Sequence, residues 1–467
     1  MTSWTVAAYA LAAVLVTGIA LCMWGVPLPL TDNLLLILDA QRTSLADGLR
    51  TAFLDRGVLR PFYWAHYKVL YELSEGRYYL AFQGVHVLLF AATVLLSVAA
   101  LRVRSAAEWA GAATALLVLL GLHTFGNLLR EQPILVVTCS ALAFALAFAE
   151  TPSRWRDGLA VVNLIVAMFI VEIGLLVWVV HAGAWLCGRR GVSRRALAAL
   201  SAAFITYFAL RFLVLRAGAP DMFPRDTGYG FSILGVDDLQ RAFGTQPLVL
   251  YTYNVMASVG SVLFSEPRGG VFEFMSRFER GGLRPWMWIS VMSSAATTAA
   301  IGWFLARSRW RGGVAAMPRA QALAIVAGLV IVANAVISYP YSRDVTMSPA
   351  GLGYALAAGV AVSALVERAA LMRAPARAGL VALLVVVSSA WAVRTVGLTY
   401  SLRTTAFVLR NDWAGVDAWL RVVGRPQTDP RARALVRVLR QQALDFRVTN
   451  PVVAQPFAEA WLGTGAY

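Results

Sequence analysis

Apolar runs of about 18–20 residues recur along most of the chain and constrain its fold more than any other feature. As a helix, each run is long enough to cross a hydrocarbon core about 30 Å thick. Of the 467 residues, 59% are hydrophobic and only 14% are charged, whereas soluble proteins carry about 25% charged residues. The sequence therefore predicts an all-α, polytopic integral membrane protein.

The spacing of the runs predicts about eleven transmembrane helices within residues 1–398. The first run lacks a basic segment before it and a cleavage site after it, so we interpret it as a retained span. Residues 399–467 are polar and arginine-rich and are predicted to form a short extracytoplasmic tail. The predicted spans are 4–24, 79–101, 106–123, 133–150, two within 158–187, 196–216, 286–306, 320–339, 350–367 and 378–398.

The formal net charge of +16 comes almost entirely from arginine, because Lys68 is the only lysine. Most arginines fall in short turns between apolar runs, which is typical of cytoplasmic turns in membrane proteins and not of a nucleic-acid surface. Applying this rule turn by turn predicts a plasma (inner) membrane protein with its N-terminus in the cytoplasm. Residues 25–77 and 218–285 are then outside, and the apolar stretch 247–264 within the second region is either re-entrant or parallel to the membrane.

The segment 158–187 is followed by GRRGVSRR, the most basic turn of the chain, and preceded by another basic turn. Both of its ends should therefore lie in the cytoplasm. Glu172 stands near its middle, and a charge at mid-membrane costs a few kcal/mol. A hairpin of two short helices would place Glu172 near the outer face, where it could line a site or form an ion pair with an arginine such as Arg211.

The first outer loop is predicted to be structured. DNLLLILDAQRTSLADGLRTAFL (residues 32–54) has apolar residues at three-to-four spacing with Asp39 on the polar face, and RPFYWAHYKVLYEL repeats the pattern with aromatic residues. Such amphipathic helices lie in the membrane interface. The predicted topology gathers the following polar residues on the outer face: Asp32, Asp39, Asp55, Arg60, His66, Lys68, Arg130, Glu131, Glu172, Arg343 and Asp344.

Three segments together resemble the GT-C superfamily of membrane glycosyltransferases. An acid after the first span is followed by the segment LRPFYWAHYKVLYELSEGRYYLAFQGVHVLLFAATVLL, which is similar to the family's pattern of Arg-Pro, histidine and hydrophobic span. FIVEIGLLVWV resembles its acidic-glycine segment, and YSRDVTMSPAGLGYALA resembles its late outer loop with an arginine. Together they cover about residues 1–400. Where the family often carries paired acids, the neighbour of Asp32 is Asn33.

The resemblance implies an enzyme that moves a sugar from a polyprenyl-phosphate donor to a glycan, lipid or protein acceptor. The matching position makes Asp32 the general base, which takes the proton of the attacking hydroxyl. Arginine suits bidentate binding of phosphate, and Arg343, Arg130 and Arg60 are the candidates for the donor phosphate. Glu172, Asp39, His66, Lys68, Glu131 and Asp344 are expected to line the site. No tight cluster of carboxylates points to a metal, and a divalent cation is left open as a cofactor.

Simpler interpretations exist for each of these residues. Thr31 or Asp32 could cap the helix that follows, and Arg343–Asp344 could be a self-paired loop. His66 and Lys68 could anchor an interfacial helix at the headgroups. A transporter or flippase of lipid-linked sugars is the alternative function, although such proteins often consist of two related halves and no internal repeat is visible. A non-catalytic scaffold is the third possibility.

Overall fold

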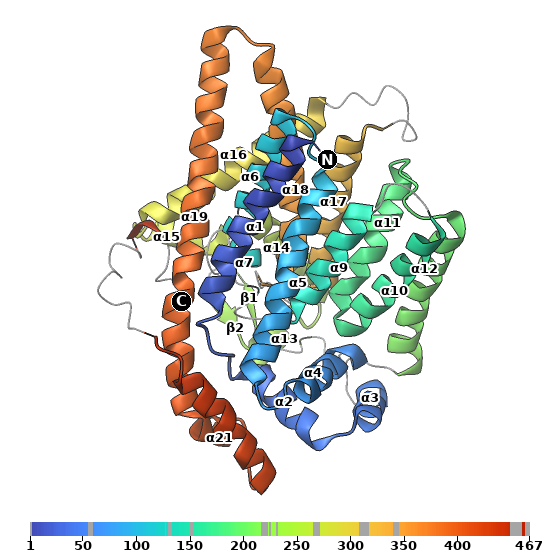
Figure 1. Ribbon diagram of the computed structural model, residues 1–467, viewed down its shortest axis with the longest axis vertical. Helices are drawn as coiled ribbons and strands as arrows, with labels where there is room; N and C mark the ends of the chain where they lie inside the picture. The colour runs from blue at the N-terminus through green and yellow to red at the C-terminus, as the bar shows by residue number, and fades with distance from the viewer. Residues whose placement is uncertain are drawn as a thin grey trace.

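The computed structural model describes residues 2–54, 59–126, 128, 133–148, 153–215, 223, 226–229, 232–264, 271–307, 317–339, 345–448 and 460–462. Nearly all regular structure in this part of the chain is helical (Figure 1). A small antiparallel hairpin accompanies the helices, formed by β1 (Thr227–Tyr229) and β2 (Ser232–Leu234).

Seven of the described helical segments are long and apolar enough to cross a membrane, which agrees with a polytopic membrane-embedded protein. Because apolar side chains are exposed along most of them, lipid rather than water is their natural surrounding. They are α1 (Ser3–Met23), α5 (Tyr78–Leu101), α12 (Arg194–Phe208) with its π-helical extension η2 (Ala209–Val214), α16 (Pro285–Arg307), α17 (Arg319–Ile337), η4 (Val345–Met347) with α18 (Ser348–Ala370), and α19 (Ala374–Ala414).

The other four predicted crossings correspond to shorter helical segments of at most 17 residues. A count of eleven spans therefore stays a prediction. The four segments are α6 (Ala106–Gly121), α9 (Leu135–Phe148), α10 (Arg154–Ile170) and the 3₁₀ turn η1 (Glu172–Leu175) with α11 (Leu176–Leu186).

Several of the basic turns gather at one end of the bundle, together with the start of α1 (Figure 1). Arg319 at the start of α17 donates a hydrogen bond to the carbonyl of Leu101, where α5 ends. Arg189, after α11, donates to the carbonyl of Met317 just before α17. Turns that are far apart in sequence thus lie side by side, as a bundle with alternating helix directions requires.

The opposite end carries three short helices of the first loop, α2 (Thr31–Arg42), α3 (Leu45–Leu54) and α4 (Pro61–Leu73) (Figure 1). The sequence predicted one continuous helix where the structure has α2 and α3. The reason is Ser44, whose hydroxyl accepts a hydrogen bond from the backbone N–H of Asp47 and so caps a new helix. We call α2, α3 and α4 the platform.

The centre of the bundle is filled by α18. In the segment Val345–Ala370, which contains α18, 78% of an apolar stretch of 18 residues is buried inside the protein. Small residues let its neighbour α6 approach closely, as in many membrane helix pairs. A Cβ atom added to Gly111 of α6 would lie 2.3 Å from the carbonyl oxygen of Gly359 in α18. A packed helix, and not a pathway, therefore occupies the middle of the described bundle.

Residues 236–279 form α13 (Val236–Phe243), α14 (Pro247–Leu263) and α15 (Val271–Glu279). α14 packs against α16, α17 and α18, and Asn254 within it donates to the carbonyl of Tyr339 after α17 (3.0 Å). This apolar helix is the stretch predicted to be re-entrant or parallel to the membrane, and its path through the bilayer stays a prediction. A single turn, α7 (His123–Gly126), follows α6.

The last predicted span, 378–398, is part of one continuous helix, α19, of 41 residues. Such a helix is about 60 Å long, twice the thickness of a hydrocarbon core. The predicted boundary at residue 398 thus falls inside α19, which continues to the platform end, where Trp413 donates to the carbonyl of Leu28 (2.7 Å). There the chain forms a helical hairpin of α20 (Val416–Val422) and α21 (Pro430–Leu444).

Replacing Gly111 by alanine should destabilise the protein, because its Cβ would meet the backbone of α18. Gly84→Ala in α5 is the matched control, since its Cβ would have no atom within 4 Å and alanine favours a helix by up to about 1 kcal/mol. Thermal unfolding in detergent micelles should show a lower midpoint for Gly111→Ala and an unchanged or higher one for Gly84→Ala. Equal midpoints would contradict close α6–α18 packing.

Candidate functional site

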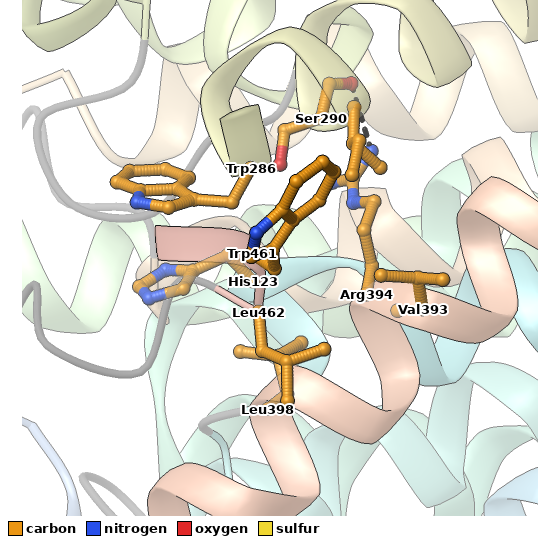
Figure 2. Close-up of a pocket in the computed structure, with 10 residues that line it drawn as sticks. His123, Trp286, Ser290, Val393, Arg394, Leu398, Trp461 and Leu462 are labelled. Carbon is orange, nitrogen blue, oxygen red and sulfur yellow. Dashed lines mark hydrogen bonds between the residues drawn. The ribbon is translucent and has the colours of Figure 1, made fainter. Parts of the chain in front are cut away.

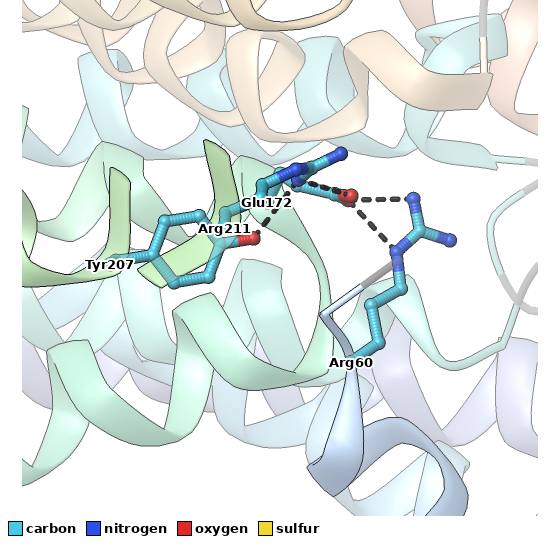
Figure 3. A network of polar contacts seen from close by, with 4 residues as sticks. All are labelled: Arg60, Glu172, Tyr207 and Arg211. Carbon is cyan, nitrogen blue, oxygen red and sulfur yellow. Dashed lines mark hydrogen bonds and ion pairs between the residues drawn. The ribbon is translucent and has the colours of Figure 1, made fainter. Parts of the chain in front are cut away.

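The carboxylate of Glu172 lies between two guanidinium groups at the platform end of the bundle (Figure 3). Its Oε2 accepts hydrogen bonds from Nε (2.9 Å) and Nη2 (2.6 Å) of Arg60. Its Oε1 lies 2.6 Å from Nη1 of Arg211, which also donates to the hydroxyl of Tyr207 (3.0 Å). We call these four residues the Glu172 network.

Local backbone geometry brings Glu172 to this position. α10 ends at Ile170, Val171 is extended, and η1 begins at Glu172. The chain turns back so tightly that a Cβ atom on Gly174 would lie 2.2 Å from the carbonyl oxygen of Ala167. Only glycine fits there, so packing explains the glycine of the Glu-Ile-Gly sequence.

The segment 158–187 folds back on itself, as the sequence predicted. Its two flanks meet at the end with the basic turns, where the backbone N–H of Ser193 donates to Asp157 (2.9 Å). Glu172 lies at the far end of this hairpin, beside Arg60 of the first loop. That its two arms cross a membrane stays a prediction.

Arg60 and Arg211 come from different elements. Arg60 precedes Pro61, which starts α4 in the position where proline is favoured. Arg211 lies in η2, the π-helical stretch that ends α12, and such stretches are frequent at functional sites. Phe169 of α10 packs edge-on against both Phe62 and Tyr207, at 5.7 and 5.8 Å between ring centroids.

The charges of this network interact strongly with one another because they are largely removed from water. The side chains of Glu172 and Arg211 are only 13% and 15% exposed, while that of Arg60 is 32% exposed. An isolated charge in such surroundings would be costly, and mutual pairing offsets the cost of desolvation. The network contributes two guanidinium groups and one carboxylate, and the side chain of Arg60 is the most exposed of the three charged ones.

Two further residues that were predicted to line the site have other partners. Lys68 is buried, with its ammonium donating to the carbonyl of Ala40 (2.8 Å) and pairing with Glu72 (2.5 Å). It thereby stabilises the C-terminal end of α2, as a cation does at a helix C-terminus. Asp39 lies 3.9 Å from Arg425 in the turn before α21. The structure thus assigns Lys68 and Asp39 contacts within and around the platform.

His66 of α4 faces α5, where its Nε2 lies 3.0 Å from Nε2 of His86. One ring nitrogen must donate and the other accept, so this pair requires at least one neutral imidazole. Burial lowers the pKa of His66 to about 4. His66 is therefore neutral at physiological pH and is a packing partner of α5.

The remaining candidates lie outside the described residues. These are Arg130, Glu131, Arg343 and Asp344. For Asp32 only the backbone is described: it is the second residue of α2. The sequence predicted that Thr31 or Asp32 would be the N-cap of this helix. That prediction is wrong, because α2 begins at Thr31 and its N-cap is Leu30. A carboxylate in the first turn is still favourable for the helix dipole.

Sequence reasoning missed one buried charge, Arg394 of α19. Its guanidinium donates to Ser293 and Ser294 of α16 (2.9 and 2.8 Å) and stacks 3.8 Å from the ring centroid of Trp391. An arginine inside the apolar run 378–398 is itself the signal that could have identified it. Figure 2 shows the pocket beside it, closed by Trp461 and Leu462. Its volume of about 20 Å³ is enough for one water molecule and not for a substrate.

The described residues include no group of three or more His, Cys, Asp or Glu side chains placed to hold a metal ion. Comparison with protein-family models, curated proteins and solved structures finds no match for the chain.

Glu172→Gln should destabilise the protein by about 2–3 kcal/mol, because two mostly buried arginines would lose their carboxylate. Asp238→Asn is the control, since Asp238 and Arg241 form an exposed ion pair of the kind worth at most about 1 kcal/mol. Reversible unfolding in mixed detergent micelles measures both changes. Similar losses for the two variants would show that the Glu172 network does not hold the fold together.

The stability of the protein should fall as the pH is lowered from about 6.5 towards 4. The pKa of His66 is lower in the folded protein than the ordinary value of about 6.5, so the unfolded chain binds the proton more readily in this window. The contribution is fully present above pH 6.5 and lost below pH 4. His66→Gln should show a shallower decrease of the unfolding temperature between pH 7 and 4.5, and identical slopes would contradict this role.

Proposed function

We propose that this protein is a membrane glycosyltransferase of the GT-C type, which transfers a sugar from a polyprenyl-phosphate donor to an acceptor on the extracytoplasmic side. The observation that carries the proposal is the convergence of Arg60 and Glu172. These residues are 112 positions apart in the sequence, and both belong to the segments that resemble the family. They meet at the platform end, where the first turn of α2 also lies.

In the proposed reaction, the oxygen of an acceptor hydroxyl forms a bond to the anomeric carbon of the donor sugar. The bond between that carbon and the phosphate oxygen breaks, and its electron pair stays on the phosphate. Asp32 takes the proton of the hydroxyl as general base. Because a phosphate is already a good leaving group, the site needs cations to hold its charge more than it needs a general acid.

The Glu172 network is our candidate for that cationic function. Glu172 fixes Arg60 and Arg211 from two sides, so their guanidinium groups are oriented before any ligand arrives, and preorganised charge is the most effective kind in a site that excludes water. Arg130 and Arg343 remain proposed phosphate ligands. Glu131 and Asp344 remain proposed site-lining residues, and the proposal leaves open the use of a divalent cation as a cofactor.

The platform suits a lipid-linked donor. α3 is strongly amphipathic and carries exposed Leu45 on a helix that follows a polar turn. Its apolar residues Leu49 and Phe53 pack against the core, so Leu45 is an apolar side chain that α3 can offer to a membrane surface, where amphipathic helices are common. A donor held by its polyprenyl chain in the bilayer would therefore present its phosphate at the level of Arg60, which precedes α4.

The alternative function, transport of the same lipid-linked sugars, would need a route across the membrane. The filled centre of the described bundle, with α18 buried along most of its length, favours the enzyme. The two functions also differ in chemistry, because a flippase moves the donor without breaking its sugar–phosphate bond.

Asp32→Asn should abolish sugar transfer while the protein still folds, because the amide cannot accept the proton. Asp237→Asn is the matched control: Asp237 is an exposed carboxylate in the first turn of α13. The sugar is first identified by mass spectrometry of envelope glycans in a deletion strain. Transfer from the corresponding polyprenyl-phosphate sugar is then measured with purified protein in liposomes, with an expected loss of at least about a hundredfold.

Transfer by Asp32→Asn within a few-fold of the wild type would remove this residue from the mechanism. Movement of intact donor across the liposome membrane by both proteins, without release of polyprenyl phosphate, would favour the flippase. Unchanged unfolding temperatures of both variants are required before either result is interpreted.

A further inference from the structure

The α20–α21 hairpin contains a groove large enough for a ligand, separate from the Glu172 network. Its volume is about 620 Å³, in the range of small-molecule sites. Four arginines from the two helices line it, together with Asp417 and apolar side chains such as Leu420 and Val436. The arginines are Arg421, Arg433, Arg437 and Arg440.

The groove is strongly cationic. Among the described residues that line it, Asp417 is the only acid, and it lies 3.5 Å from Arg440. Four guanidinium groups against one carboxylate leave a net charge of +3. Among the described residues, the side chains of Arg421, Arg433 and Arg437 have no hydrogen-bond or ion-pair partner. Like charges converging on one groove repel each other, and a bound anion would relieve that repulsion.

The position of the hairpin indicates the type of anion. Gln442 of α21 donates to the carbonyl of Gly76 (2.6 Å), two residues before the candidate membrane helix α5 begins. The ring of Phe446 lies 5.6 Å from that of Tyr79, in the first turn of α5. The C-terminal end of α21 is therefore at the level where the apolar part of the bundle starts.

From Arg440 to Arg433 the axis of α21 advances by about 10 Å. The polar headgroup region of a bilayer extends about 5–8 Å beyond the hydrocarbon core on each side. The arginines that α21 contributes to the groove thus lie within about 10 Å of one another along the helix axis, a span comparable with the thickness of the headgroup region. Exposed valines next to them, Val422 at 85% and Val438 at 43% exposed, suit the apolar side of the same interface.

We propose that the α20–α21 groove binds the phosphate headgroups of anionic lipids in the adjacent leaflet and so holds the hairpin at the membrane surface. Clusters of four or more basic residues beside a membrane span are typical of such recognition. Arginine provides bidentate contacts to phosphate, and both helices contribute arginines to the groove. This inference does not depend on the proposed glycosyl transfer.

The test uses the full chain purified in dodecyl maltoside, with cardiolipin as the anionic probe and phosphatidylcholine as the neutral one. Native mass spectrometry at low salt measures the affinity for each lipid. Arg433→Gln with Arg437→Gln should weaken cardiolipin binding about tenfold to thirtyfold. Arg431→Gln with Arg447→Gln removes the same charge from exposed positions outside the groove and should weaken binding less than about threefold.

Equal losses in the two double variants would show a general effect of charge and overturn the proposal. Equal binding of cardiolipin and phosphatidylcholine by the wild type would also overturn it. Inorganic pyrophosphate is titrated in a third arm: if it binds to the groove and cardiolipin does not, the site is one for soluble phosphates and not for lipid. Since the groove arginines are not part of the packed core and repel one another, the unfolding temperature of the groove variant without added lipid should be equal to or higher than that of the wild type.

Discussion

The double ion pair of Glu172 is the interaction on which the arrangement of the platform end depends. A mostly buried carboxylate must be neutralised by groups that reach it with good geometry, and here those groups come from α4 and from the end of α12. Meeting this one requirement fixes the first loop against two helices from the middle of the chain. The aromatic contacts around Phe169 then exclude water and strengthen the same interactions.

Much of the architecture could be predicted because its causes are local. Apolar runs identify the long helices without knowledge of their neighbours, and the penalty for a charge in the membrane predicted that Glu172 lies at a turn and that Arg211 is a suitable partner. The break between α2 and α3 was also local, since Ser44 is followed three residues later by Asp47. The helical spacing of apolar residues continues across this capping signal, and the prediction of one helix followed that spacing alone.

Other features depend on partners that sequence order does not reveal. Nothing in the first loop identifies Glu172, 112 residues away, as the partner of Arg60. Lys68 was expected among polar groups of the outer face, but the carbonyl of Ala40 requires a donor where α2 ends. Arg394 is tolerated inside an apolar run because serines of α16 face it. In each case the role of a charged residue is set by what tertiary packing places beside it.

The two arginine clusters at the platform end, the Glu172 network and the α20–α21 groove, differ in burial. The two functions that we propose for them follow from this difference. Charges of the Glu172 network are mostly removed from water, so ions in solution screen them weakly. They are suited to a phosphate whose charge grows during a reaction. The arginines of the α20–α21 groove are more exposed, and salt weakens their attraction to phosphate. They are suited to reversible contact with a surface of many headgroups. In the two proposals above, arginine recognises phosphate at two sites on one face of the protein, and the burial of the arginines distinguishes these sites.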